Sequence, residues 1–218
     1  KPSSAASDVY KRQILNPLED IVKKNDLSLP DAIQEKHKII YKNAKRLSRL
    51  IDELMDFRKM EGAYDKIVSV EMIEAIGFDL FNPYFSRIEN LMKPNGTAVI
   101  QAITYPDNDY DTYRKGCDFI QKFIFPGSLL PSVATMENSI KLTNMKIDNL
   151  ERIGPHYATT LNLWNENFNR NIEEIKKLGF DQYFINLWNY YFSYCEAGFA
   201  NGTIDDVQLV LKGGKASA

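Results

Sequence analysis

Apolar residues recur every three or four positions in two stretches near the start of the chain. The first stretch runs from Ile14 to Lys24 and the second from Asp31 to Arg58. This spacing places the apolar side chains on one face of a helix. Pro30, between the two stretches, suits the first turn of a new helix. The pattern therefore predicts a helical hairpin over residues 14–61, with the shape of an antiparallel pair or of half a four-helix dimer.

After residue 61 the pattern changes to short, β-branched apolar runs that alternate with helical stretches. The runs predict strands over Asp65–Met72, Thr97–Tyr105, Lys146–Arg152 and Asp206–Leu211. Helices are expected over Pro83–Met92, from Pro131-Ser132 onward, and over Leu161–Leu178 and Asp181–Phe199, with a turn at Lys93–Gly96. Core-like spacings in the last two helices select Trp164, Phe168, Trp188, Tyr191 and Phe192. The alternation predicts an α/β fold in which helices cover the faces of a sheet.

The composition excludes several classes of protein. Of 218 residues, 44% are hydrophobic and 26% charged, which is ordinary for a globular protein and unlike a disordered chain. No run of about 18 uncharged apolar residues predicts a transmembrane segment, and Lys1 to Gln13 lacks the apolar stretch of a secretory signal. A net charge of −2 gives no reason to expect nucleic acid as a partner. Two cysteines without a CxxC pair argue against a zinc site and fit a reducing cytoplasm.

Aromatic residues and charge divide the chain into unlike parts. Residues 1–63 hold 3 of the 26 aromatic residues and, with 13 basic and 10 acidic side chains, a net charge of +3. The remainder holds 23 aromatic residues and a net charge of −5. We divide the chain into a tail, the hairpin, a main domain and a second tail, over residues 1–13, 14–61, 62–212 and 213–218.

The segment Ser3 to Gln13 (SSAASDVYKRQ) resembles the in-frame translation of a widely used transposase sequencing adapter. Eleven consecutive positions match, so the resemblance implies that residues 1–13 are derived from an adapter. We therefore do not expect residues 1–13 to belong to the fold.

The hairpin carries motifs of its own. Ile14 to Glu19 (ILNPLE), Tyr41 to Leu47 (YKNAKRL) and Leu54 to Glu61 (LMDFRKME) resemble the dimerisation hairpin of sensor histidine kinases. The resemblance implies a homodimer through residues 14–61. It places the phosphate-accepting position at Ala5, so no phosphotransfer is expected, and His37 is read as a surface or interface residue.

Short motifs in the main domain occur in a recognisable order. They are YDKIVSVEMIEAIG (64–77), LMKPNG (91–96), QAIT (101–104), IFPG (124–127) with LPS (130–132), HYA (156–158) with Trp164, and WNYYF (188–192) with CEAGF (195–199). Together they resemble the C-terminal half of cyclopropane-fatty-acyl-phospholipid synthases, including the mycolic acid cyclopropane synthases, over about residues 57–212. The resemblance implies a partial Rossmann-like methyltransferase sheet with about four C-terminal strands.

The resemblance also implies a reaction and its site. Methylene would be transferred from S-adenosylmethionine to cis double bonds of phospholipid acyl chains, with a bound bicarbonate as proton acceptor. The residues implied for the bicarbonate are Glu74, Gln101 and Tyr157, with backbone groups near Val70 and Ile103. Several family members have His where this chain has Gln101, and an amide cannot titrate near neutral pH.

Three further residues are implied at the acyl chain. Cys195 aligns with a cysteine often assigned to the active site, so the resemblance makes it catalytic, and Phe125, Tyr191 and Cys195 would line the acyl pocket. The Tyr191 ring could stabilise a cation. Without the resemblance, Glu74 reads as a helix-start carboxylate, Gln101 as an edge-strand residue, and Tyr157 and Cys195 as core residues.

A methyltransferase of this class binds its cofactor on an acidic-Gly-x-Gly loop. The glycines of this chain begin at Gly62, so we expect the adenosylmethionine-binding half to be missing and the chain alone to be inactive. A chimeric, metagenomic reading frame would explain the join near Asp56 to Gly62. Two other functions stay open, a methyltransferase of a soluble amine or small molecule and a non-catalytic signalling scaffold. The expected location is the bacterial cytoplasm, peripheral to the inner face of the membrane.

Overall fold

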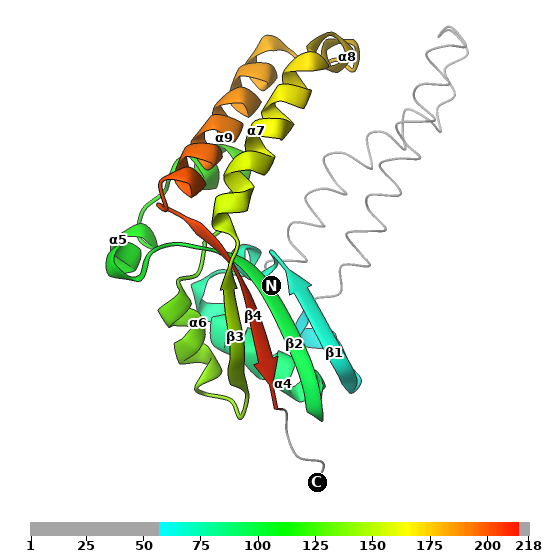
Figure 1. The fold of residues 1–218 in the computed structure, drawn as a ribbon, viewed down its shortest axis with the longest axis vertical. Helices are drawn as coiled ribbons and strands as arrows, with labels where there is room; N and C mark the ends of the chain where they lie inside the picture. Colours follow the sequence, from blue (N-terminus) through cyan, green and yellow to red (C-terminus); the bar gives the residue numbers. More distant parts are fainter. Residues whose placement is uncertain (1–56, 214–218) are drawn as a thin grey trace, which may run out of the picture. The chain divides into compact units, whose positions relative to one another are not determined.

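The computed structural model describes residues 57–213, and the part of the chain from Glu61 onward forms one compact unit (Figure 1). The predictions about the adapter-like tail, His37, the homodimer and most of the hairpin fall on residues 1–56 and lie outside the described residues. Of the predicted hairpin the structure describes the end, where Phe57–Lys59 forms a 3-10 turn, η2.

Four strands form one sheet in the order β1-β2-β4-β3. They are β1 (Tyr64–Val70), β2 (Met92–Thr104), β3 (Lys146–Arg152) and β4 (Asp205–Lys212). β1 and β2 are parallel, whereas β4 runs antiparallel to both β2 and β3. The prediction of a four-stranded α/β sheet is confirmed, and the strand directions make it a mixed sheet.

The helices are α4 (Phe81–Leu91), α5 (Tyr110–Tyr113), α6 (Val133–Ile140), α7 (Gly154–Arg170), α8 (Ile172–Lys177) and α9 (Gln182–Ala200). Single turns lie at η3 (Ile73–Ala75), η4 (Phe78–Leu80), η5 (Asp107–Asp109) and η6 (Ile120–Ile124). α6 begins as expected, because the Ser132 side chain caps it by accepting from the Thr135 N–H.

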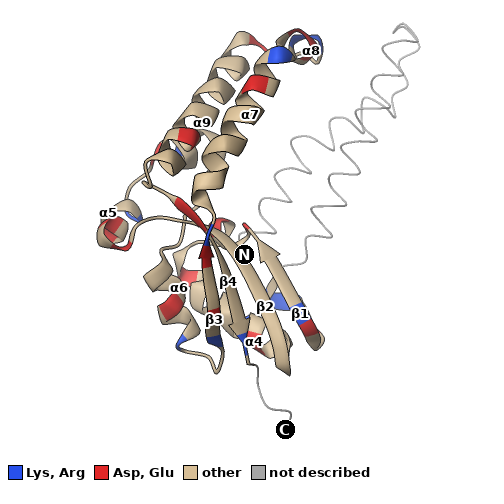
Figure 2. Ribbon diagram, viewed as in Figure 1, with Lys and Arg blue, Asp and Glu red and all other residues tan. Residues whose placement is uncertain are grey.

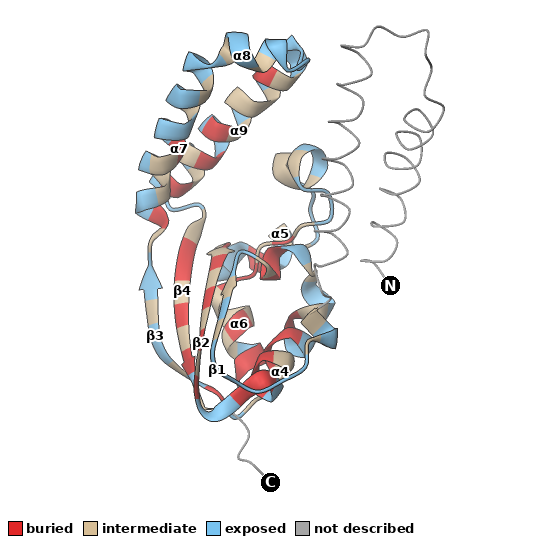
Figure 3. Cartoon of the chain, turned by 90° about the vertical axis from the view of Figure 1, so that its right-hand side faces the viewer, coloured by how far each residue is buried: buried red, intermediate tan, exposed pale blue. Residues whose placement is uncertain are grey.

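The core lies between the sheet and α4 and α6, which cover one face (Figure 1). Along β2 the side chains alternate, so that Ala98, Ile100 and Ala102 are fully buried, whereas Val99, Gln101 and Ile103 on the other face are only partly buried. Figure 3 shows this contrast between the buried central strands and the exposed outer ones. Polar groups on the partly covered face therefore remain accessible.

β1 forms an edge of the sheet within the described residues. It pairs with β2 on one side, and its side chains Val68 and Val70 are 70% and 57% exposed. A parallel edge strand has one free hydrogen-bonding side. Other elements normally cover such an edge when its side chains are apolar and exposed.

The expected turn at Lys93–Gly96 lies inside β2. Tyr64 pairs with Met92 and Lys66 already pairs with Thr97, so the intervening residues bulge out of the ladder. A side chain at Gly96 would collide with Met92 and with the Lys93 carbonyl. The glycine therefore permits a tight bend within a segment that is otherwise strand.

The predicted helix Leu161–Leu178 is wrong at its start and at its centre. α7 begins seven residues earlier, at Gly154, and the chain breaks at Asn171 before α8. The last helix agrees closely, because the Asp181 side chain caps α9 by accepting from the Phe184 N–H. α7 and α9 pack side by side and extend beyond the sheet, with α8 at the far tip (Figure 1).

The predicted aromatic core of these helices is confirmed in part. Phe192 is buried, and Phe168, Trp188 and Tyr191 pack against it at the edge of the same cluster. Trp164 is 52% exposed and does not belong to the core. At α8 the charged side chains form short-range pairs, Lys176 with Glu173 and Lys177 with Glu174. Figure 2 shows acidic and basic residues close together on α8.

Candidate active site at the carboxyl ends of two parallel strands

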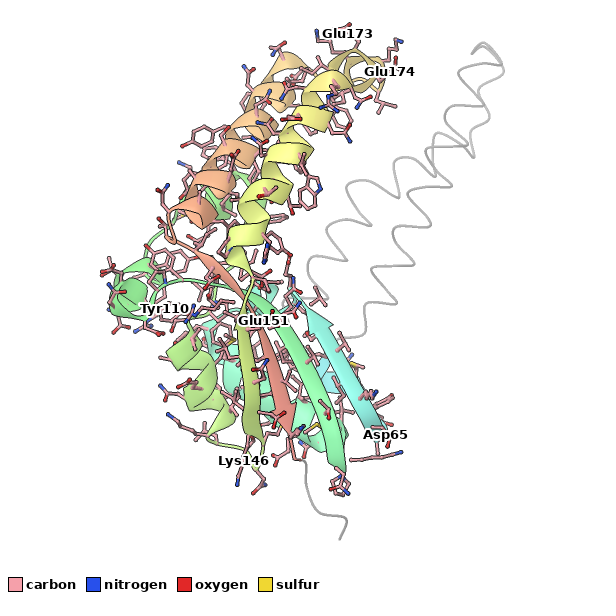
Figure 4. The ribbon with its side chains drawn as sticks, viewed as in Figure 1. Asp65, Tyr110, Lys146, Glu151, Glu173 and Glu174 are labelled. Atoms are coloured by element: carbon pink, nitrogen blue, oxygen red, sulfur yellow. The ribbon has the colours of Figure 1, made fainter. Side chains whose placement is uncertain are left out.

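A polar cluster lies where β1 ends. In the sheet register Val70 is opposite Gln101, and Gln101 is opposite Gln208 of β4. Asp65 and Lys146 lie at the other end of the sheet, where β1 and β3 begin, and Glu151 lies near the end of β3 (Figure 4). Ligands of α/β proteins commonly bind at the carboxyl ends of parallel strands, so this end is the candidate site.

Gln101 is the centre of the cluster. Its Nε2 lies 2.9 Å from the Tyr157 hydroxyl, 3.0 Å from Asp206 Oδ2 and 3.2 Å from Glu71 Oε1. Its Oε1 accepts a bond of 2.9 Å from Gln208 Nε2, which fixes which end of the amide carries the donors. A neutral side chain with two N–H groups thus joins two carboxylates and a phenol.

Tyr157 is placed by the start of α7. A Cβ at Gly154 would collide with the Asp205 side chain, so the glycine lets the helix begin directly against β4. One turn later the Tyr157 hydroxyl donates a bond of 2.7 Å to Glu71 Oε1, and its ring lies 5.1 Å from that of Phe199. Burial, together with the neighbouring Glu71 carboxylate, raises the pKa of Tyr157, so the phenol stays a donor.

Glu74 lies on the turn η3, behind this cluster. It is 8% exposed, and its Oε1 accepts a bond of 2.8 Å from the Ile103 N–H, while Oε2 has no hydrogen-bond partner among the described residues. The pKa of Glu74 is raised to about 7, chiefly by burial and to a smaller extent by the charges of Glu71 and Asp206.

Asp206 is the third carboxyl group and is fully buried. Burial and then the Glu71 charge raise its pKa to about 6, against the lowering effect of hydrogen bonding with Tyr157 and Gln101. Its Oδ1 has no partner within residues 57–213. Glu74 and Asp206 are buried and have raised pKa values, whereas Glu71 beside them is exposed. Carboxyl groups with such different environments are typical of sites that accept and donate protons.

The implied acyl-pocket residues lie on the neighbouring apolar side. Cys195 is buried in a cluster that Tyr157, Ile103 and Tyr191 flank, so the two parts of the site adjoin. Burial raises the pKa values of Cys195 and Tyr191 to about 12 each. Tyr191 meets Phe125 edge to face at 6.5 Å.

A cavity of about 370 Å³ opens beside Cys195. Its lining includes Ile120, Leu130, Tyr194 and Ile204. The cavity lining does not include Phe125 or Tyr191, so only Cys195 of the three implied pocket residues borders it. The apolar and aromatic wall suits a hydrocarbon chain better than a charged ligand.

The implied bicarbonate does not fit these residues. Its expected donors are already engaged by the chain's own carboxylates, the Ile103 N–H by Glu74 and both the Tyr157 hydroxyl and Gln101 Nε2 by Glu71. Val70, also implied for it, ends β1 directly before Glu71. A second anion would meet the charge of Glu71 without free donors to offset it.

Sequence reasoning missed Glu71, Asp206 and Gln208. Glu71 lies in the same motif, 64–77, as Glu74, which the resemblance selected, and it directly follows an apolar strand. Gln208 is a polar residue within an apolar strand, as Gln101 is. That Asp206 and Gln208 meet Gln101 depends on the antiparallel placement of β4, which no local pattern reveals.

Among the described residues, no group of three or more His, Cys, Asp or Glu side chains could hold a metal ion. A helix long and apolar enough to cross a membrane is likewise absent from residues 57–213.

Comparisons with known proteins identify the family of the chain. Residues 23–209 match the family described as mycolic acid cyclopropane synthetase, a match that begins inside the predicted hairpin. The chain is 42% identical over 160 residues to a tuberculostearic acid methyltransferase of Mycobacterium tuberculosis, covering 73% of this chain and 38% of that protein. It is 29% identical over 161 residues to the cyclopropane-fatty-acyl-phospholipid synthase of Escherichia coli, covering 74% and 41%. The chain thus spans about two fifths of the length of these curated relatives.

Solved structures share the fold. The cyclopropane synthase MmaA2 of Mycobacterium tuberculosis superposes with a TM-score of 0.66 at 22% identity, covering 78% of this chain and 67% of that one. The mycolic acid cyclopropane synthase CmaA1, in complex with S-adenosylhomocysteine, gives 0.65 at 22% identity with the same coverage. The family match spans most of the chain, the sheet is the one that these methyltransferases have, and the chain belongs to the mycolic acid cyclopropane synthetase family of S-adenosylmethionine-dependent methyltransferases.

Proposed function

We propose that these residues are the acyl-modifying part of a cyclopropane-fatty-acyl-phospholipid synthase, which transfers methylene to cis double bonds of phospholipid acyl chains. The proposal rests on the contact between a polar cluster and an apolar cluster. The polar cluster around Gln101 adjoins the apolar cluster of Cys195 through Tyr157. An alkene carbon held at this boundary would meet a hydrocarbon wall on one side and carboxylate on the other.

S-adenosylmethionine supplies an electrophilic methyl group when it is bound. The double bond that accepts this methyl becomes a carbocation, which needs negative charge nearby and a group that removes one proton. Glu71 supplies the charge, and the ring of Tyr191 supplies a face that stabilises a cation. The raised pKa of Cys195 keeps its thiol neutral, so in this proposal it packs against the acyl chain rather than attacking it.

The proposed place of action is the membrane surface on its cytoplasmic side. Phe123, Phe125 and Tyr190 are 48%, 54% and 54% exposed, and Tyr194, which lines the cavity, is also exposed. Aromatic side chains that are partly buried and partly exposed to water suit the interface between lipid and water. They support entry of an acyl chain toward Cys195.

We further propose that this chain by itself does not turn over. The proposal rests on the lack of an acidic-Gly-x-Gly loop in the sequence, which the family's cofactor site requires. The same reading makes the chain a chimera of adapter, histidine-kinase hairpin and synthase segment. Sequencing single DNA molecules that span codons 40 to 80 tests the join, and a reproducible spanning product would establish a genuine fusion instead.

A hybrid enzyme tests the function. Residues 62–212 would replace the matching segment of the Escherichia coli cyclopropane-fatty-acyl-phospholipid synthase. The hybrid would then receive ¹³C-methyl adenosylmethionine and vesicles whose phospholipids carry cis-monounsaturated chains. We expect ¹³C in the acyl chains and ring-proton signals by NMR, and no label with fully saturated vesicles.

A folded hybrid that labels soluble amines and leaves acyl chains unlabelled would contradict the proposal and favour the amine methyltransferase. If the NMR signals are those of a methyl branch or a methylene branch instead of a ring, the acyl chain is still the substrate, but the product is not a cyclopropane. Calorimetric titration of the unmodified chain with adenosylmethionine checks the second proposal, since micromolar binding would overturn it.

A further inference from the structure

Glu71 has an unusual backbone. Directly after β1 it takes a φ of 49°, and it is the one non-glycine residue with positive φ in the described part of the chain. A residue with a Cβ is held in this left-handed region only when surrounding contacts fix it, at a cost of about 1–2 kcal/mol. Here the Glu71 N–H donates a bond of 2.9 Å to the Gln101 carbonyl, which extends the pairing of β1 with β2 by one residue.

The conformation turns the Glu71 carboxylate into the polar cluster. Its Oε1 accepts bonds of 2.7 Å from the Tyr157 hydroxyl and 3.2 Å from Gln101 Nε2. Both bonds are accepted by Oε1, and within residues 57–213 no side-chain donor bonds to Oε2. One oxygen is therefore fixed by two donors, and the second is available to another molecule.

The three carboxyl groups of the site are not equivalent. Glu74 is 8% exposed with its Oε1 on the Ile103 N–H, and Asp206 is fully buried beside Gln101. Glu71 alone of the three is exposed. A substrate that enters from the accessible face of the sheet reaches Glu71 first.

The charge of Glu71 governs its neighbours. It raises the pKa values of Glu74, Asp206, Tyr157 and Tyr191, which are the titratable groups around it. These four groups therefore favour their neutral forms in the presence of the Glu71 anion. The site is built around one carboxylate charge that is fixed by a phenol and an amide.

We propose that the Glu71 carboxylate is the proton acceptor of the methyl-transfer reaction, and that it fills the position for which a bicarbonate was expected. A carboxylate and a bicarbonate have the same planar pair of oxygens, and the donors that would hold one hold the other. This inference rests on the proposed function, because it assigns a base to that reaction.

The π electrons of the alkene form a bond to the methyl carbon of the sulfonium donor, whose sulfur leaves with the electron pair of the broken bond. The acyl chain is then a carbocation. One C–H bond of the transferred methyl breaks, its proton goes to a carboxylate oxygen of Glu71, and its electron pair closes the carbon–carbon bond of the ring. The Glu71 carboxylic acid afterwards returns its proton to water.

Anion binding by the full chain tests the position of Glu71 without requiring turnover. Wild type, Glu71→Gly and Glu71→Gln would be titrated with ¹³C-bicarbonate and followed by NMR. Glycine removes the carboxylate and accepts the positive φ, so the Tyr157 and Gln101 donors become available. We expect Glu71→Gly to bind bicarbonate about tenfold or more tightly than wild type, which corresponds to about 1.4 kcal/mol. Glu71→Gln, which fills the space, should bind like wild type.

Equal binding by wild type and Glu71→Gly would overturn the inference, and so would a folded Glu71→Gly that binds no bicarbonate. Circular dichroism checks that each variant is folded, and Glu71→Ala provides a second way to open the site. In the hybrid enzyme, Glu71→Gln should lose activity by about 10²–10⁴-fold, the usual contribution of a general base. Bicarbonate should restore activity to Glu71→Gly only.

Failure of this inference differs from failure of the proposed function. If the hybrid modifies no acyl chain, the function fails, while the binding titration still reports whether Glu71 fills an anion position. If the hybrid is active and Glu71→Gln retains its rate, the function stands and the assignment of the base is wrong.

Discussion

The Tyr157 hydroxyl donates a hydrogen bond of 2.7 Å to the carboxylate of Glu71, a residue that lies 86 positions earlier in the chain. The bond joins the start of α7 to the end of β1, two elements that do not pack on each other through the main core. It also orients the phenol so that its oxygen can accept from Gln101 at 2.9 Å. One hydroxyl therefore connects the helical pair to both parallel strands.

The first prediction concerns the effect of removing this hydroxyl on stability. Tyr157→Phe should lower the free energy of unfolding by about 1 kcal/mol, because Gln101 loses an acceptor and Glu71 loses a donor. Urea denaturation measures the change. Tyr190→Phe is the matched control, since its half-exposed ring stacks on Tyr194 and its hydroxyl has no hydrogen bond among the described residues. Equal stability of Tyr157→Phe and wild type would show that the bond contributes nothing.

The positive φ of Glu71 gives the second prediction. Glu71→Gly and Glu71→Ala both remove the carboxylate, but only alanine must hold a Cβ in the left-handed region. Glu71→Gly should therefore be the more stable of the two by about 1 kcal/mol. At the exposed strand position Glu151 the order should reverse, because glycine there costs chain entropy without relief of strain. The same order at both positions would contradict the assigned backbone.

The third prediction concerns pH. Burial is the main cause that raises the pKa of Glu74 from 4.5 to about 7. Between these two pH values the folded chain therefore keeps a proton on Glu74 that the unfolded chain has released. The contribution of Glu74 to stability is thus fully present below about pH 4.5 and is lost as the pH rises through 7. Asp206, with its pKa raised to about 6, acts in the same direction.

Glu74→Gln should remove the Glu74 part of this decline and leave the part that Asp206 contributes. At pH 8 the variant should be more stable than wild type, by up to about 3 kcal/mol, while near pH 4.5 the two should be similar. Denaturation curves at several pH values measure the difference, and Glu151→Gln, at an exposed strand position, should leave the slope unchanged. Parallel pH profiles for Glu74→Gln and wild type would mean that Glu74 is solvated in solution.

The two cysteines give the fourth prediction. Cys117 is exposed, whereas Cys195 is buried and has its pKa raised to about 12. Because the thiolate is the reactive form, iodoacetamide should modify Cys117 rapidly and Cys195 only after unfolding. Mass spectrometry counts the modified sites, and Cys117→Ser should remain unmodified in the native state. Rapid labelling of Cys195 in that variant would argue against its burial.

The sequence by itself determined the elements of the main domain. Runs such as Lys146–Arg152 and capping residues such as Ser132 and Asp181 act over a few positions, so their strand and helices follow from local preference. The turn at Lys93–Gly96 was expected from the sequence, but its position inside β2 was not, because the pairing of Tyr64 with Met92 decides where that strand begins. The break at Asn171 was not predicted either. The order of motifs was sufficient to indicate the methyltransferase family.

Only the tertiary structure decided which polar residues form the site. Gln101, Tyr157 and Glu74 were expected together, and the structure joins the first two directly and adds Glu71 and Asp206. Asp206 reaches Gln101 because β4 runs antiparallel beside β2, and Glu71 reaches Tyr157 because its φ is positive. Strand direction and a single backbone angle depend on contacts across the whole sheet. A periodic pattern of apolar residues records burial, not the partner that each polar group meets.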